Sequence, residues 1–268
     1  MVRTAEHHID EAVDRLLIFS DLHTFLSPLR AMDAVRAGYG GREQVIFNGD
    51  NYHGGLQPIE TTQWIMDHAG PLATLGNHDE AMLATKGEGG VSPPPCTEPG
   101  AYQVLSAEQR EYVAGLPHRL ALEWRGVKIV VMHGHVTPGG GEGSYRWSPS
   151  EQIEHFVDGS ADLYVLGHTH YAYVEEVDGG IAANSGSAAV PILAFADDEG
   201  VHPQSGRETI EGEDLRCSFM SVTEDGGKPA VEIVRFDYDR DAMVAEFAWA
   251  GEEHLTTFRR WLAEGVLG

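Results

Sequence analysis

The chain has 268 residues, 42 of them acidic and 18 basic, and its formal net charge is −24. A chain of this length can bury roughly three quarters of its unfolded surface, and its acidity excludes stable binding of long nucleic acids. The first fourteen residues lack the apolar core of a secretory signal, no apolar run approaches the ~18 residues of a membrane span, and two cysteines are too few for a disulfide framework. We therefore expect a soluble, cytoplasmic protein without a membrane contact; its oligomeric state is not determined.

Short apolar runs alternate with helical patterns in the first 76 residues. Strands are predicted at residues 16–20, 44–48 and 72–75, with helices beginning at Pro28 and Pro58 between them. A strand–helix–strand order at these intervals indicates parallel strands joined by crossover helices. In such sheets ligands bind at the carboxyl ends of the strands.

The rest of the chain is predicted to be mostly strands. Ser106 and Ser148 each begin a helix through a capping box, and the C-terminal residues 252–265 form an amphipathic helix. The remaining strands are expected at residues 119–124, 127–132, 162–166, 171–177, 181–183, 215–223 and 230–238. Residues 86–100 and 196–214 are predicted insertions without regular structure, and His7 and His8 a solvated tail. No repeat or linker divides the chain, so we expect one domain over residues 1–268.

Five predicted strands share one feature: aspartate, histidine or asparagine lies at the C-terminal end of each. These residues are Asp21, His23, Asp50, Asn77, His133, His168 and His170. Oxygen and imidazole donors without a thiolate favour Mn²⁺, Fe²⁺ or Zn²⁺. Because a catalytic zinc uses three protein ligands, seven donors fit two cations about 3.5–4 Å apart that share one carboxylate.

The order of these motifs resembles the calcineurin-like metallophosphoesterases over residues 16–191. The motifs are D-x-H at 21–23, G-D at 49–50, G-N-H-D at 76–79, H-G-H at 133–135, G-H-T-H at 167–170 and N-S-G-S at 184–187. The resemblance implies a four-layer α/β/β/α sandwich of two mixed sheets. It also implies two divalent cations, with Mn²⁺ expected first and Fe, Zn, Co or Ni as alternatives.

The resemblance assigns a role to each residue of the motifs. One cation takes Asp21, His23 and His170, the other takes Asn77, His133 and His168, and Asp50 bridges both. His78 faces the substrate and is held by Asp79. Two cations, two aspartates and a bridging hydroxide leave a net charge of about +1, which attracts a phosphate and allows in-line attack. His78, protonated beside Asp79, stabilises charge or protonates the leaving group.

We therefore expect a hydrolase for a small phosphodiester or phosphomonoester, most similar to small prokaryotic phosphodiesterases of the family. Alternatives are a dinucleotide polyphosphatase, a protein phosphatase and a non-catalytic scaffold. Residues 49–55 lack the arginine with which protein phosphatase relatives hold the phosphate, and every ligand that scaffold members lose is kept. Outside the motifs, His135 is a structural residue, a support for the ligands or a substrate contact, His53 fills a turn, and Arg146 could reach a phosphate.

The excess of acidic residues also suggests adaptation to a salt-rich cytoplasm, in which screening removes self-repulsion. The alternative is a solubilising surface only. Unfolding in low and in molar KCl separates the two, since equal stability in both would contradict salt adaptation.

Overall fold

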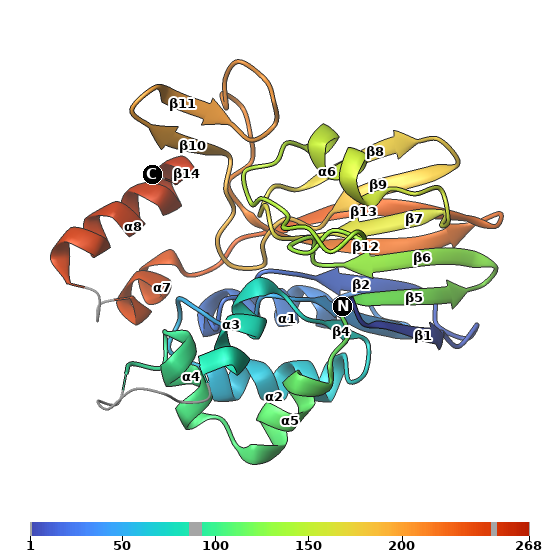
Figure 1. The fold of residues 1–268 in the computed structure, drawn as a ribbon, viewed down its shortest axis with the longest axis horizontal. Helices are drawn as coiled ribbons and strands as arrows, with labels where there is room; N and C mark the ends of the chain where they lie inside the picture. The colour runs from blue at the N-terminus through green and yellow to red at the C-terminus, as the bar shows by residue number, and fades with distance from the viewer. Residues whose placement is uncertain (1, 86–92, 248–250, 268) are drawn as a thin grey trace.

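Two mixed β-sheets pack face to face, and helices cover both outer faces (Figure 1). The structure is a computed structural model that describes residues 2–85, 93–247 and 251–267. The arrangement is a four-layer α/β/β/α sandwich, so the predicted fold class is confirmed.

The first sheet has five strands in the order β13-β12-β2-β3-β4. Strands β2, β3 and β4 are parallel, whereas β12 and β13 run antiparallel to their neighbours. The strands are β2 (Arg15–Phe19), β3 (Glu43–Asn48), β4 (Ala73–Thr74), β12 (Cys217–Asp225) and β13 (Lys228–Phe236). Its outer face carries α1 (Leu26–Ala37), α2 (Pro58–His68), α3 (Asn77–Thr85) and α5 (Ala107–Gly115). The predicted crossover helices at Pro28 and Pro58 and the Ser106 capping box are all present.

The second sheet has six strands in the order β1-β5-β6-β7-β9-β8. Strand β7 lies parallel to both β6 and β9, and the pairs β5–β6 and β8–β9 are antiparallel hairpins. The strands are β1 (Thr4–His8), β5 (Arg119–Trp124), β6 (Val127–Met132), β7 (Leu163–Leu166), β8 (Tyr173–Val177) and β9 (Gly180–Asn184). Helix α6 (Pro149–Phe156), which begins at the predicted Ser148 capping box, packs on the outer face through Phe156.

Alternating side chains of the buried strands build the layers. Leu16 and Ile18 of β2 enter the core between the two sheets, whereas Leu17 and Phe19 face the helices. Since successive strand residues point to opposite faces, one apolar run supplies both layers. Each such side chain contributes about 1.5–3 kcal/mol on burial. The sandwich therefore holds the ends of its strands in fixed positions.

Three parts of the chain differ from the sequence-based expectation. Residues 4–8 form β1, which pairs with β5, so a solvated tail at His7 and His8 is wrong. The segment 196–214 begins in a hairpin of β10 (Ala194–Asp197) and β11 (Gly200–Pro203), to which β14 (Val266–Leu267) adds. Helix α4 (Glu98–Val104) begins inside the loop predicted at 86–100, of which residues 86–92 lie outside the described ranges. In the first case, and for β14 in the second, backbone pairing with a distant segment decides the structure.

The C-terminal part adds helices beside the sandwich. Helix α7 (Arg240–Glu246) is not predicted, and α8 (Glu252–Glu264) confirms the predicted amphipathic helix. Both lie with the β10-β11-β14 sheet at one end of the sandwich, on the left of Figure 1. Among the described residues, no helix has an apolar stretch long enough to cross a bilayer.

Candidate metal centre and active-site cavity

The strand ends bring six of the seven predicted ligands into two buried groups. Asp21, His23 and His170 form one triad, and Asp50, His133 and His168 form the other. Within each triad the candidate ligand atoms lie within 4.8 Å of one another. Asp21 Oδ1 lies 3.8 Å from His133 Nε2, so the triads adjoin. The seventh predicted ligand, Asn77, lies at the start of α3 and lines the same cavity.

The backbone at these positions is strained. Eight non-glycine residues have a positive φ in the described ranges, and five of them are predicted ligands: Asp21, His23, Asp50, His168 and His170, with φ between 53° and 69°. A non-glycine residue in this region is uncommon, and such strain concentrates at functional sites where the surrounding structure enforces it. The turns after the strands thus aim the ligands inward at a conformational cost.

Two glycines are required because the turns are tightly packed. A Cβ atom on Gly76 would lie 2.0 Å from Asp50 Oδ1, and one on Gly167 would lie 2.4 Å from Ser20 Oγ. Any side chain at either position would displace a group that orients a ligand. The glycines of G-N-H-D and G-H-T-H therefore permit the close approach of strand ends.

The hydrogen bonds of three histidines determine which ring nitrogen faces the site. Nδ1–H donates to backbone carbonyls: His23 to Tyr52 and His53 (2.9 and 3.0 Å), His133 to Asn48 (2.8 Å) and His170 to Val190 (2.6 Å). Because a carbonyl only accepts, Nδ1 carries a proton in each of these rings, and the lone pair of a ring without a second proton is on the inward-facing Nε2. The Nε2 atoms of His23 and His170 lie only 3.1 Å apart. Two facing lone pairs at this distance repel unless a cation lies between them.

The two aspartates are oriented in the same manner. Asp21 Oδ2 accepts hydrogen bonds from the Ser20 hydroxyl and from the amide of His168, and its Oδ1 faces the triads. Asp50 Oδ1 accepts from the amide of His78 (2.9 Å), which leaves Oδ2 3.2 Å from His133 Nε2. Each carboxylate therefore presents one oxygen to the site and uses the other for its own positioning.

In the described part of the chain, several buried atoms that could bind a cation have no hydrogen-bond partner. Asp21 Oδ1, Asn77 Oδ1 and His133 Nε2 form no hydrogen bond there, although all three are inaccessible to solvent. Leaving a buried polar atom unpaired costs about 1–3 kcal/mol. These atoms are two oxygens and one imidazole nitrogen, the donor types that bind hard-to-borderline divalent cations. The residues present therefore fit a pair of divalent cations.

The electrostatics of the triads agree with this fit. Burial and the neighbouring His170 lower the pKa of His23 to about 3, and burial beside His133 lowers that of His168 to about 3. Burial alone would raise the pKa of Asp50, but His133 and His78 hold it well below its usual range. Against the effect of burial, Asp50 and Asp21 raise the pKa of His133 to about 10, so without a cation this ring holds a proton. The site therefore combines neutral His23 and His168 with an ionised Asp50, and a cation would displace the proton of His133.

The structure changes the predicted partner of His78. His78 Nδ1–H donates to Glu98 Oε1 at 2.9 Å, and His53 Nδ1 lies 3.1 Å from the same oxygen. Asp79 instead accepts from the backbone amides of Gly76 (2.8 Å), Asp50 (3.0 Å) and Asn51 (3.0 Å). The prediction that Asp79 holds His78 is therefore wrong, because the first turn of α3 directs that carboxylate at amides of the strand-end loops. Glu98 holds the ring of His78, and Asp79 fixes the loop that carries Asp50.

The charges around His78 favour its protonated form. Burial opposes the charge on His78, but Asp50 and the hydrogen bond to Glu98 raise its pKa. Burial and the neighbouring Asp50 raise the pKa of Asp79 to about 7. Glu98 is thus the ionised partner, because hydrogen bonds from His53 and His78 lower its pKa in spite of burial.

Three residues outside the predicted ligand set lie near the site: His53, His135 and Arg146. His53 stacks on the ring of His78, with centroids 4.6 Å apart, and lines the cavity, so it does more than fill a turn. His135 lies outside both triads, and its Nε2 is 2.9 Å from Glu80 Oε2. Arg146 lies over the rings of Tyr145 and Phe195. Glu98 carries no signal in the sequence, because it follows a proline-rich loop twenty residues beyond His78.

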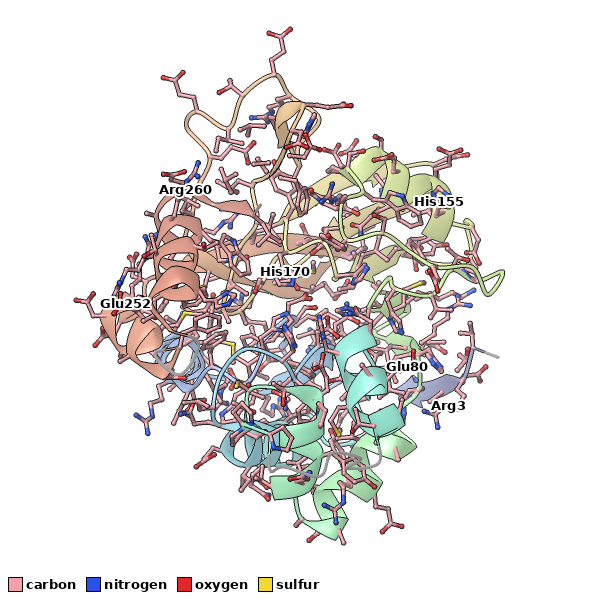
Figure 2. The ribbon with its side chains drawn as sticks, turned by 60° about the vertical axis from the view of Figure 1, so that its left-hand side comes forward. Arg3, Glu80, His155, His170, Glu252 and Arg260 are labelled. Atoms are coloured by element: carbon pink, nitrogen blue, oxygen red, sulfur yellow. The ribbon has the colours of Figure 1, made fainter. Side chains whose placement is uncertain are left out.

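A cavity of about 310 Å³ opens above the triads and has two unlike sides. The side that we name the metal floor consists of His23, Asp50, Asn77, His168 and His170. The side that we name the apolar wall consists of Val190, Ile192, Phe247, Phe258, Trp261 and Leu267. Figure 2 shows His170 near the middle of the molecule and Glu252 and Arg260 on the outer side of α8. The inner side of α8 thus faces the triads.

Comparison with known proteins agrees with the fold and the strand-end motifs. Residues 15–199 match the model of the calcineurin-like phosphoesterase superfamily domain. The chain therefore belongs to the calcineurin-like phosphoesterase superfamily. A search of curated proteins found no match.

Two solved structures share the fold. The chain is similar to a metallophosphoesterase from Sphaerobacter thermophilus, with 23% identity, 95% of this chain and 100% of that chain covered, and a TM-score of 0.69. It is also similar to a hypothetical protein from Pyrococcus horikoshii OT3, with 15% identity, 90% and 96% coverage and a TM-score of 0.64. At these identities the likeness establishes the fold alone.

Proposed function

We propose that the chain hydrolyses a small phosphodiester or phosphomonoester with the help of two divalent cations, Mn²⁺ in the first place. The first cation would be held by Asp21, His23 and His170, and the second by Asn77, His133 and His168. Asp50 would be shared between them. The observation that carries this proposal is the pair of facing Nε2 atoms, His23 and His170, 3.1 Å apart beside unpaired buried oxygens.

Divalent cations bound at the floor would supply a water activated for attack and neutralise charge on the phosphoryl oxygens. The ionised carboxylates of Asp21 and Asp50 would hold these cations. The carbonyl-bound imidazoles cannot rotate away, so the donor atoms are positioned before a substrate arrives.

His78 is assigned the proton transfer to the leaving group. Its Nδ1 is occupied by Glu98, so Nε2 is the ring nitrogen available to a substrate in the cavity. A protonated His78 would donate from Nε2 to the ester oxygen as that oxygen departs. Glu98 keeps the ring in this orientation and stabilises its positive charge.

The proposal is tested by metal analysis combined with two ester substrates. The protein is stripped with a chelator and reloaded with Mn²⁺, Fe²⁺, Zn²⁺, Co²⁺ or Ni²⁺. It is then assayed on bis-p-nitrophenyl phosphate and p-nitrophenyl phosphate. We expect two cations per chain and metal-dependent release of p-nitrophenol. Binding of two cations without turnover of either ester would contradict the proposal and favour a scaffold.

The role of His78 has its own test. His78→Ala should lower turnover by ~10²–10⁴-fold, the range for loss of a general acid, with unchanged metal content. Loss of a cation in this variant would show that His78 is a ligand instead.

A further inference from the structure

The apolar wall is a preformed surface. The ring of Phe258 stacks on that of Phe247 with centroids 4.1 Å apart, and on that of Phe25 at 5.9 Å. The indole N–H of Trp261 donates to the carbonyl of Pro191 at 3.1 Å. The wall is therefore held by ring packing and hydrogen bonds before any ligand binds.

The end of the chain fastens the wall to the sandwich. Gly265 ends α8 in the left-handed conformation, and its carbonyl accepts from the amides of Leu193 and Ala194. Strand β14 then pairs with β10, which brings Leu267 to the cavity. Four of the six wall residues lie beyond residue 199, where the match to the superfamily model ends. The wall is thus an addition to the metal floor.

An apolar surface beside a charged metal site indicates what the cavity accepts. Ligand cavities are lined mainly by apolar and aromatic side chains, with a few polar groups that fix orientation. Here the polar groups gather on the floor and the aromatic groups on the wall, so a ligand would have one anionic end and one apolar end. Aromatic rings favour an aromatic partner through stacking or edge contacts.

The charged residues of the cavity indicate which charges the ligand can carry besides its anionic end. Among the described residues that line it, none is lysine or arginine. Arg146 lies next to the lining residue Tyr145, but its guanidinium packs over the Tyr145 and Phe195 rings. The formal net charge of the whole chain is −24. A second phosphate or a carboxylate at the wall would therefore meet apolar side chains without a lysine or arginine to pair with it.

We propose that the substrate is a phosphoester of an aromatic or otherwise hydrophobic alcohol that carries no negative charge besides the reacting phosphate. This inference rests on the proposed function and names its substrate class. It disfavours dinucleotide polyphosphates, whose additional phosphates the wall does not match.

The test compares three phosphonates that cannot be hydrolysed. Methylphosphonate, benzylphosphonate and 4-carboxybenzylphosphonate are titrated calorimetrically into the Mn²⁺-loaded protein. We expect benzylphosphonate to bind at least about tenfold more tightly than methylphosphonate, because its ring is buried against the wall. The added carboxylate should remove this advantage. Equal affinity for the first two, or tighter binding of 4-carboxybenzylphosphonate, would overturn the inference.

Two tryptophan variants locate the effect. Trp261→Ala should bring the ratio of the benzyl and methyl dissociation constants towards one. Trp64→Ala, a partly buried tryptophan of α2 that does not line the cavity, should keep the ratio. A ratio unchanged in Trp261→Ala would overturn the assignment to the wall. If Trp261→Ala does not fold, the affinities of the three phosphonates for the unchanged protein still test the substrate class.

The test separates this inference from the proposed function. A benzyl preference without turnover of p-nitrophenyl esters would contradict the function and leave the wall as a binding surface. Turnover of those esters without a benzyl preference would overturn the substrate class and leave the function intact.

Discussion

The metal floor and the apolar wall are built from opposite kinds of structure. The floor consists of buried polar side chains on strained backbone at strand ends, between residues 21 and 170. The wall consists of apolar side chains between residues 190 and 267, and half of them are carried by α8 and β14. In the wall region, from residue 190 onward, the described residues with positive φ are all glycines. Under the proposed function, the floor would carry the chemistry and the wall the selectivity, as separate parts of one cavity.

The largest effect is expected from breaking the floor at its shared carboxylate. Asp50→Asn should lower turnover by about a thousand-fold, the effect of losing one preorganised electrostatic group, and should lower the metal content. Asp178→Asn, an exposed aspartate in the turn between β8 and β9, is the matched control. A metal content of two in Asp50→Asn would contradict its bridging role.

Metal addition should stabilise the floor independently of the wall. Because cations bind the folded chain, Mn²⁺ at a hundred times its dissociation constant should raise the free energy of unfolding by about 2.7 kcal/mol per site. Chemical unfolding with and without a chelator measures this increase. The same increase in Trp261→Ala would show that the floor does not depend on the wall. Absence of any increase in the unchanged protein would contradict metal binding.

A smaller effect should follow from a methyl group added behind the floor. Gly76→Ala would place its Cβ against Asp50 and should destabilise the fold by about 1–3 kcal/mol, with loss of metal affinity. Gly115→Ala at the end of α5 adds the same methyl group where nothing lies within 4 Å, and it should be nearly neutral. Equal unfolding midpoints for the two variants would contradict the close packing of Gly76 against Asp50.

The smallest effect is expected from Glu98, which holds the ring of His78 beside the floor. Glu98→Gln keeps the shape but removes the charge, so turnover should fall about tenfold, the value of one charge-assisted hydrogen bond. Metal content should not change. Glu111→Gln, an exposed residue of α5, is the control. An effect as large as that of His78→Ala would mean that Glu98 contacts the substrate itself.

The sequence predicts the site residues best where a buried strand ends in a turn. The buried runs before Asp21, Asp50, His133 and His168 have strand length, and a turn residue follows each run at once. Parallel strands place their carboxyl ends at one edge, so neighbouring motifs could be assigned to one site. The partner of His78 could not be assigned in this way. Asp79 is its neighbour in sequence, whereas Glu98 reaches it only because α4 packs against α3.

The polar edge strand β1 illustrates a second limit. Residues 4–8 alternate between exposed and partly exposed positions, so their sequence lacks the apolar pattern of a buried strand. Their backbone pairs with β5, and this pairing depends on a segment more than a hundred residues away. The hairpin of β10 and β11 is likewise completed by β14 at the end of the chain.

The four-layer sandwich was expected from the resemblance of the motifs to a known family. The residues alone indicate parallel strands with crossover helices, the order of the strand-end motifs and the kind of ligand atoms that they offer. These properties follow from local periodicity and from the chemistry of single side chains. The packing of distant segments decides which carboxylate holds His78, which nitrogen of His23, His133 and His170 faces inward, and that apolar C-terminal residues line the same cavity as the floor. These depend on contacts between segments distant in sequence, whose geometry no local pattern encodes.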